Sequence, residues 1–275
     1  MKSIRILVLS SLLLFSATVK LQAGIFNQAI GARSAGLGFT GITLTDFWSA
    51  IHNQAGLASI KKSSAGIYVE NEFLLKSLST HAFAFIQPVA NGSFGLSMLR
   101  FGETAFNETM IALSYGHKLS KEFLIGIQLF HYAINQSNHH GMAGVFSFQG
   151  GFIYTPAERI SIAFHIFSPH LVNHSSTEIK LAEIVTLGLG YHLSESLQGF
   201  IEFQNHSKLG QGLNSGLEIQ SPRKLAFRVG YSSFSKKFTF GIGLKIKKLS
   251  IDFGSSMHNQ LGYSPQLSLS YAFGK

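Results

Sequence analysis

Twelve histidines offer nitrogen ligands that could hold a metal ion, in a chain that contains no cysteine. They cluster in two places, at 139–140 and around His165, His170 and His174. A zinc site needs three or four converging ligands. Both clusters lie among residues typical of polar loops, and the second has Pro169 within it. We therefore expect these histidines to lie in loops and at a membrane interface, and we expect no metal site.

Residues 36–41 (Gly-Leu-Gly-Phe-Thr-Gly) fit the G-x-G-x-x-G pattern of dinucleotide-binding proteins. That fingerprint needs a strand before it, a helix after it and an acidic residue about 20 positions further on. The sequence has Lys61 at that last position. No Gly-x-Ser-x-Gly elbow for a nucleophilic serine occurs either. These residues predict a flexible segment of small side chains, with no cofactor and no enzymatic activity.

Charged residues are scarce, and their distribution along the chain indicates which kind of secondary structure the chain forms. Charged residues make up 13% of the chain, where about 25% is usual for soluble domains. None occurs between Lys76 and Arg100 or between Glu122 and Glu158. Polar residues interrupt both stretches, so they do not suit membrane helices, which need about 20 predominantly apolar residues. A barrel strand needs apolar residues on its lipid face alone, over about 9–11 residues.

Apolar residues alternate with small or polar ones, which is the pattern of strands with one apolar face. Examples are Val185-Leu187-Leu189-Tyr191 and Phe238-Phe240-Ile242-Leu244-Ile246. This predicts an all-β, transmembrane, antiparallel β-barrel of about 14 strands over residues 64–275. The expected strands are 64–72, 78–88, 92–102, 108–118, 122–134, 143–155, 159–167, 184–192, 197–204, 212–220, 224–231, 238–246, 249–255 and 265–273.

The same alternation predicts which side chains face the lumen. The polar ones are Ser147, Gln149, Thr186, His192, Glu218 and Lys245, and the glycines are Gly188, Gly190, Gly241 and Gly243. Small inward residues leave room either for a plug or for a ligand, and the sequence does not choose between them. The mixed, partly polar lumen predicted in this way is a poor lining for a fatty acyl chain.

Turns and aromatic residues predict the orientation of the barrel. Tight turns alternate with longer polar segments, which are 103–107, 135–141, 168–183, 204–211 and 255–264. Short turns are typical of the periplasmic rim and longer loops of the outer rim. Tyr115, Tyr154, Tyr191 and Tyr271 fall in the outward register near the periplasmic ends of their strands, as an aromatic girdle requires. The alternating apolar residues of 267–273 resemble the terminal signal that barrels use for membrane assembly.

The first 23 residues have the features of a secretory signal peptide. Lys2 and Arg5 give a positive start, residues 6–19 are mainly apolar, and Ala23 ends the segment with a small residue. This predicts export, and with the barrel it predicts localisation in the outer membrane. The formal net charge of +9 is spread along the chain, so the expected contact is anionic lipid, and nucleic acid is not an expected partner.

Residues 24–63 lack strand alternation and form a separate segment. Glycines and small residues at 31–41 lead to a predicted short helix at 45–53, capped by Thr45 or Asp46. A turn at 54–57 follows. The segment resembles the start of the PorV/PorQ family, relatives of the FadL-type fatty-acid channels. The residues that carry the resemblance or its plug motif are Gly31, Ala32, Arg33, Asp46, Trp48, Asn53, Ala55, Gly56 and Leu57. Gln54 replaces the usual proline.

The resemblance implies a 14-stranded, FadL-like barrel with residues 24–63 as a plug in its lumen. It also implies association with type IX protein secretion or with surface attachment of secreted proteins, through protein partners. The alternative is a FadL-type transporter of hydrophobic small molecules such as long-chain fatty acids. We expect Arg33 to anchor the plug, because a guanidinium group offers five donors to carboxylates or carbonyls. The inward residues Glu202 and Glu218 are the expected acids.

Overall fold

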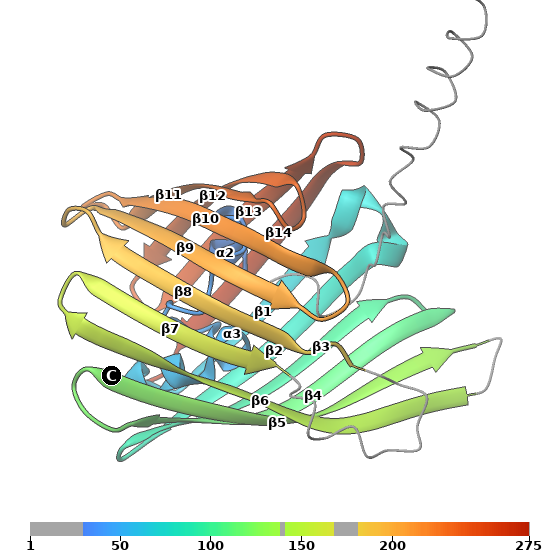
Figure 1. The fold of residues 1–275 in the computed structure, drawn as a ribbon, viewed down its shortest axis with the longest axis horizontal. Helices are drawn as coiled ribbons and strands as arrows, with labels where there is room; N and C mark the ends of the chain where they lie inside the picture. Colours follow the sequence, from blue (N-terminus) through green and yellow to red (C-terminus); the bar gives the residue numbers. More distant parts are fainter. Residues whose placement is uncertain (1–29, 138–140, 168–180, 275) are drawn as a thin grey trace, which may run out of the picture.

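The structure is a computed structural model that describes residues 30–137, 141–167 and 181–274. Its main feature is a closed antiparallel barrel of 14 strands in sequence order, drawn in Figure 1. The barrel closes where β1 pairs with β14, with Ser64 opposite Ala272. The predicted signal peptide at 1–23 lies outside the described residues. No helix in the described part of the chain is long and apolar enough to cross a bilayer.

The strands follow the predicted order, and most of their ends lie within a few residues of the predicted ones. They are β1 (Ser64–Asn71), β2 (Ser79–Val89), β3 (Gly92–Gly102), β4 (Phe106–Lys118), β5 (Phe123–Gln136), β6 (Gly141–Ala157), β7 (Ile160–Phe167), β8 (Ile184–His192), β9 (Leu197–His206), β10 (Gly210–Gln220), β11 (Leu225–Ser232), β12 (Lys237–Ile246), β13 (Leu249–His258) and β14 (Gly262–Ala272). The prediction of a 14-stranded barrel is confirmed.

The predicted contrast between short turns and long loops is only partly correct. Strands β9 and β10 extend through most of the polar segment 204–211, and β13 and β14 extend through most of 255–264. The reason is that ladder hydrogen bonds join backbone groups, so strands continue into polar sequence. At that end the β1–β2 connection stays long and contains the short helices η2 (Glu72–Leu74) and η3 (Lys76–Leu78). We call the opposite end, at 90–91 and 247–248, the short-turn end.

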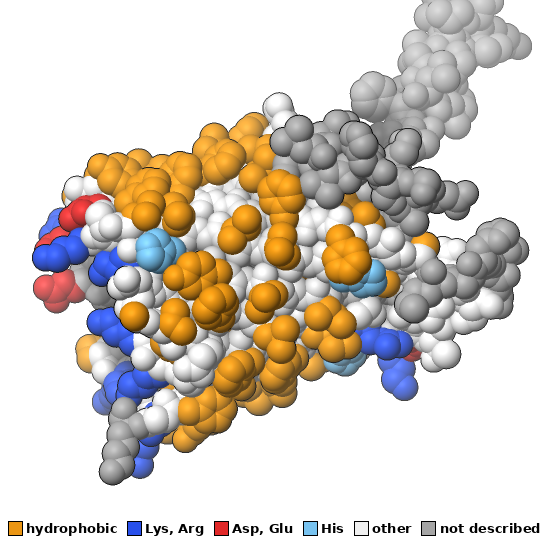
Figure 2. Space-filling view, turned by 90° about the horizontal axis from the view of Figure 1, so that it is seen from below, with side chains coloured by type: hydrophobic (Ala, Val, Ile, Leu, Met, Phe, Trp, Pro, Cys, Tyr) orange, Lys and Arg blue, Asp and Glu red, His pale blue; other side chains and the backbone are white. Residues whose placement is uncertain are grey.

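The outer wall is apolar, as a surface in contact with lipid requires. Hydrophobic side chains spread over it in Figure 2. The predicted girdle residues Tyr154, Tyr191 and Tyr271 are exposed on it by 41–45%. Basic side chains gather at the short-turn end in Figure 2. We call the basic residues in or beside the turns of this end the basic rim, which includes Lys61, Lys62, Lys118, Lys121, Arg159, Arg223, Lys224, Lys245, Lys247 and Lys248. Lys245 keeps the expected inward register of Gly241 and Gly243, and its side chain is exposed because it lies at the end of β12.

Residues 30–60 lie inside the barrel, where Figure 1 shows them in blue. They form α2 (Ala32–Gly36), α3 (Ser49–His52) and the 3₁₀ helix η1 (Gln54–Ser59). We call residues 30–60 the plug. The helix predicted at 45–53 is shorter than expected. Asn53 ends it in an extended conformation, with φ −153°, because its side chain accepts a hydrogen bond from the amide of Ala55.

Glycines on the lumen face bring the plug backbone against the wall. A Cβ atom at Gly216 would lie 2.4 Å from the Leu37 oxygen, and one at Gly230 would lie 2.2 Å from the Gly38 nitrogen. A Cβ at Gly188 would lie 2.8 Å from Ile42 Cγ1. These inward glycines leave room for the plug, one of the two uses that the sequence left open.

We predict that Gly230→Val displaces the plug, because the added side chain would overlap the backbone of Gly38. The expected destabilisation is about 1–3 kcal/mol, with faster proteolysis within residues 30–60 of the detergent-solubilised barrel. The matched control is Gly199→Val, whose nearest neighbours are the flexible side chains of Leu193 and Leu217. Equal protease resistance of the two variants would contradict the close contact.

Candidate functional site

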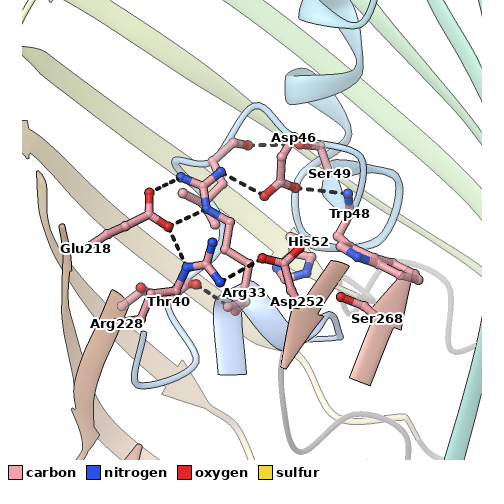
Figure 3. Close-up of polar contacts among 12 residues, drawn as sticks. Arg33, Thr40, Asp46, Trp48, Ser49, His52, Glu218, Arg228, Asp252 and Ser268 are labelled. Carbon is pink, nitrogen blue, oxygen red and sulfur yellow. Dashed lines mark hydrogen bonds and ion pairs between the residues drawn. The ribbon is translucent and has the colours of Figure 1, made fainter. Parts of the chain in front are cut away.

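Charged side chains of the plug and the wall meet on one side of the lumen (Figure 3). Arg33 on α2 donates from Nε and Nη2 to the two carboxylate oxygens of Glu218 on β10, at 3.0 and 2.7 Å. Its Nη1 donates to Asp46 Oδ2 at 3.1 Å. Arg228 on β11 donates to the same Glu218 at 2.5 Å and to Asp252 on β13 at 2.7 Å. One buried carboxylate therefore joins a guanidinium of the plug to a guanidinium of the wall.

Because this ion cluster is largely buried, its stability depends on every charged side chain in it. The Glu218 side chain is fully buried, and that of Arg228 is 5% exposed. Burial by itself lowers the pKa of Arg33, but the carboxylates of Glu218 and Asp46 outweigh it and raise that pKa above its usual value. Breaking a buried ion pair by removing one partner costs roughly 3–5 kcal/mol, because the other charge stays buried and uncompensated. The cluster thus holds α2 against β10.

Glu202 does not pair with Arg33, so that part of the expectation is wrong. Its Oε1 accepts hydrogen bonds from the amides of Gly41 and Ile42, at 2.6 and 2.8 Å. A plug inside a barrel brings backbone amides away from water, and each needs an acceptor. Glu202 on β9 supplies one acceptor for two consecutive amides and fixes the plug at this point.

The plug-motif residues that were identified in the sequence lie close together in the structure. They are held by packing and by hydrogen bonds from side chains to backbone groups. Gly31 has φ 110°, and a Cβ there would lie 2.7 Å from Trp48 Cγ. Asp46 Oδ1 accepts from the Trp48 amide at 2.9 Å. The Asn53 amide group donates to Ile42 O at 3.0 Å and to wall carbonyls of β6 and β7 at 3.2 and 3.4 Å.

The remaining motif residues lie in η1 and pack on β3, β4 and β5. Ala55 and Leu57 are completely buried. A Cβ at Gly56 would lie 2.4 Å from Ser49 Oγ, so this position needs glycine. Gln54, at the position of the expected proline, begins η1 and donates from its side chain to Ile51 O at 3.3 Å. The motif therefore works as a packing unit.

A cavity of about 130 Å³ lies between the plug and the strand ends opposite the short turns. Apolar and polar side chains line it in two sets, an apolar wall and a polar wall, which adjoin on β7 and β8, where the pair Phe167 and Ile184 lies beside the pair His165 and Thr186. The apolar wall contains Ile30, Phe39, Ile42, Ile51, Leu99, Met110, Phe167, Ile184 and Phe234. The polar wall contains Gln149, His165, Thr186, Glu202, Gln204, Asn214, Ser232 and Ser235, and His52 of the plug adjoins it. We call this space the lumen cavity.

A second, larger space of about 800 Å³ opens at the short-turn end. It is lined by Thr43, Leu44 and Thr45 of the plug and by the turns at 88–92, while Gly41 and Ile42 line the lumen cavity. Consecutive residues of the plug thus face opposite compartments. Residues 41–45 form a septum between them, and Glu202 holds the septum through the amides of Gly41 and Ile42.

Polar and apolar side chains occupy more separate parts of the lumen than the sequence indicated. The expected polar residues Ser147, Gln149, Thr186 and Glu218 are buried within it. On β1–β8, however, inward side chains form a buried apolar cluster with the plug, which includes Tyr68, Leu99, Met110, Phe130, Tyr132, Phe167 and Ile184. The prediction of a lumen poorly suited to apolar ligands is therefore wrong for this side of the barrel.

Of the two histidine clusters noted in the sequence, only His165 lies within the described residues. His165 lines the lumen cavity, whereas His139, His140, His170 and His174 lie outside the described residues. Within the described part of the chain, no three His, Asp or Glu side chains converge as metal ligands would. His165 therefore contributes an imidazole to the cavity wall.

Sequence reasoning missed Arg228, Asp252 and the role of Glu202 in the septum. A signal for Arg228 and Asp252 was present, because each is a charge in the inward register of a strand whose outward neighbours are apolar. Phe227 and Val229 flank Arg228. Such charges inside a membrane barrel must pair. Arg228 pairs with Asp252 and shares the fully buried Glu218 with Arg33.

We predict that Arg33→Met loosens the plug, because Glu218 loses one of its two guanidinium partners. The expected cost is roughly 3 kcal/mol, and the conductance of the barrel in planar bilayers should rise. The control is Arg223→Met in the exposed β10–β11 turn, which should leave both properties unchanged. Unaltered conductance and thermal stability of Arg33→Met would refute the anchor role.

We predict that acid weakens the docking of the plug through His52. Its Nε2–H donates to Ile30 O, and Nδ1 is buried without a partner. Burial lowers its pKa from 6.5 to about 4, against a smaller opposing effect of Asp46. Since the folded-state pKa is lower than that of the unfolded state, stability is full above pH 6.5 and falls as the pH drops towards 4. The loss is on the order of 3 kcal/mol.

Hydrogen exchange of residues 30–60, measured from pH 7.5 to 4, would check this prediction. The control is His52→Asn, which does not titrate and should show a weaker pH dependence. The same pH dependence in both proteins would assign the effect to other groups.

Known proteins resemble this chain in their structures and not in their sequences. No family model matches the sequence, and no curated protein matches it. Among solved structures, the chain is similar to a Pseudomonas aeruginosa FadL homologue (TM-score 0.64, 11% identity), covering 89% of this chain and 98% of that one. It is also similar to the Ralstonia pickettii toluene transporter TbuX (TM-score 0.65, 11% identity, 91% and 100% covered).

A third similar structure is the P. putida toluene transporter TodX, with a TM-score of 0.65, 12% identity and 90% and 99% of the two chains covered. These identities are low, so the likeness concerns the fold and does not carry over ligands. Neither a family model nor a curated relative supports the finer PorV/PorQ resemblance. The chain is a 14-stranded barrel of the FadL-like fold.

Proposed function

We propose that this chain is a non-enzymatic outer-membrane channel for small hydrophobic molecules. The observation that carries the proposal is the lumen cavity, whose apolar wall joins the buried apolar cluster of β1–β8. Its volume of about 130 Å³ is close to that of an apolar cavity of about 150 Å³ that binds benzene. The ligand in this proposal is therefore the size of one aromatic ring, smaller than the long-chain fatty acids considered from the sequence.

The transport path follows from the septum. A ligand enters the lumen cavity from the end with the longer loops, which in outer-membrane barrels is the outer side. Residues 41–45 then separate it from the larger space at the short-turn, periplasmic end. Passage requires the septum to move, and the two hydrogen bonds to Glu202 are the interactions that must break. The names of the similar structures, which include toluene transporters, agree with this ligand size.

We predict that the purified barrel binds toluene in lipid nanodiscs and that Ile184→Trp reduces its affinity at least tenfold. Ile184 is buried and lines the lumen cavity, so a larger side chain there fills the space of the ligand. The matched control is Leu187→Trp, on the lipid face of the same strand and 51% exposed. Calorimetry with empty nanodiscs as the blank measures the affinity. Equal loss in both variants, or none in either, would remove the cavity as the binding site.

A second candidate function is participation in type IX secretion, through outer-membrane protein partners. The observations in its favour are the plug motif at 31–57, which resembles the PorV/PorQ family, and the septum between the lumen cavity and the space at the short-turn end. Co-purification from native membranes followed by mass spectrometry separates the two candidates. Recovery of secretion components by a barrel that binds no toluene would favour this second function.

A further inference from the structure

We infer that the lumen cavity selects a neutral ring-sized ligand that carries a hydroxyl group, an inference that rests on the proposed function. The observation behind it is the distribution of unpaired polar atoms. In the described part of the chain, ten buried side-chain nitrogen or oxygen atoms have no hydrogen-bond partner. Four belong to residues that line this cavity: His52 Nδ1, His165 Nε2, Asn214 Oδ1 and Ser235 Oγ.

The other six unpaired atoms belong to residues that do not line this cavity, so the cavity is where several of them gather. An unpaired buried donor or acceptor costs about 1–3 kcal/mol, and most native polar groups avoid this cost. His165 and Asn214 are each 6% exposed. Both side chains line the same cavity, from β7 and from β10, so a ligand there meets an unpaired polar atom at either place.

The register of the strands makes these residues parts of one wall. His165 on β7 lies opposite Thr186 on β8, and Thr186 lies opposite Gln204 on β9. Glu202 on β9 lies opposite Asn214 on β10, and Asn214 lies opposite Ser232 on β11. Inward residues of five adjacent strands thus form a continuous polar wall. Leu99 on β3, Met110 on β4 and the plug residues Ile30 and Ile51 add apolar side chains to the same cavity.

This two-sided lining defines the chemistry of the ligand. One face of the ligand must be apolar, and the other must carry a hydrogen-bonding group that reaches His165 or Asn214. A hydroxyl group both donates and accepts, so it can pair with Asn214 Oδ1 and with either tautomer of His165. A carboxylate would lie in the same wall as the carboxylate of Glu202. A charged ammonium group would have to lose its hydration beside the apolar wall, which is costly.

The experiment compares phenol with toluene, which have similar sizes and differ by a hydroxyl in place of a methyl group. Affinities of both ligands are measured by calorimetry for the full chain in nanodiscs. The readout is the ratio of the phenol Kd to the toluene Kd, and its change between variants cancels the difference in hydration of the two ligands. Asn214→Leu and His165→Leu are made separately, so that a folding failure of one leaves the other.

We expect each variant to raise this ratio about tenfold, by weakening phenol binding while toluene binding is retained or improved. Retained toluene binding and heat-modifiable migration on SDS gels show that the variant barrel is folded. The control is Ser256→Ala on β13, which removes an unpaired buried hydroxyl outside the cavity and should leave the ratio unchanged.

The outcomes separate this inference from the proposed function. If the wild-type protein binds neither ligand, the proposed function fails and this inference fails with it. If it binds toluene and the ratio is the same in all four proteins, the proposed function stands and the selection of a hydroxyl group is overturned. A rise in the ratio for the two cavity variants alone supports both.

Discussion

The width of a 14-stranded barrel is the constraint on which the other features of this structure depend. A barrel of about eight strands is filled by its own side chains, and wider ones leave an interior space. Here the plug fills much of that space. A chain segment inside a barrel brings its backbone amides and carbonyls away from water, and these groups need partners. The lumen face must therefore supply both close backbone contact and hydrogen-bonding groups.

The wall meets these two demands on different strands. Glu202 on β9 and Glu218 on β10 bind the plug through backbone hydrogen bonds and an ion pair, and Arg228 on β11 joins Glu218 to Asp252 on β13. Strands β1–β8 contribute the apolar cluster. The cavity lies where these two kinds of wall meet, so its two-sided lining follows from the way in which the plug is held. The residues that fix the plug therefore adjoin those that line the cavity, and Glu202 belongs to both sets.

The barrel was predictable from sequence because lipid contacts every second residue of a strand. In β8 and β12, exposed apolar residues alternate with buried inward ones, as this contact requires. The ends of β9 and β13 were not predictable in this way, because polar residues there still join backbone ladders. Glu218 was identified as an acid facing the lumen, and its partner Arg33 was identified as a donor. The role of Glu202 depended on where the amides of Gly41 and Ile42 lie after folding, and no local pattern in the sequence encodes that position.

The basic rim at the short-turn end fixes the height of the barrel in its bilayer. A lysine or arginine on the lipid face costs about 2–4 kcal/mol at the centre of the membrane and about 0–1 near its surface. The residues of this rim on the outer surface therefore resist any movement that draws them into hydrocarbon, whereas Lys61, Lys118 and Lys121 line the space inside the short-turn end. Membranes differ in thickness, and proteins adjust to that difference. In this barrel the adjustment takes place at the far rim, beside Phe234 and Ser235. The thickness of the bilayer thus sets how far below the lipid surface the mouth of the lumen cavity lies.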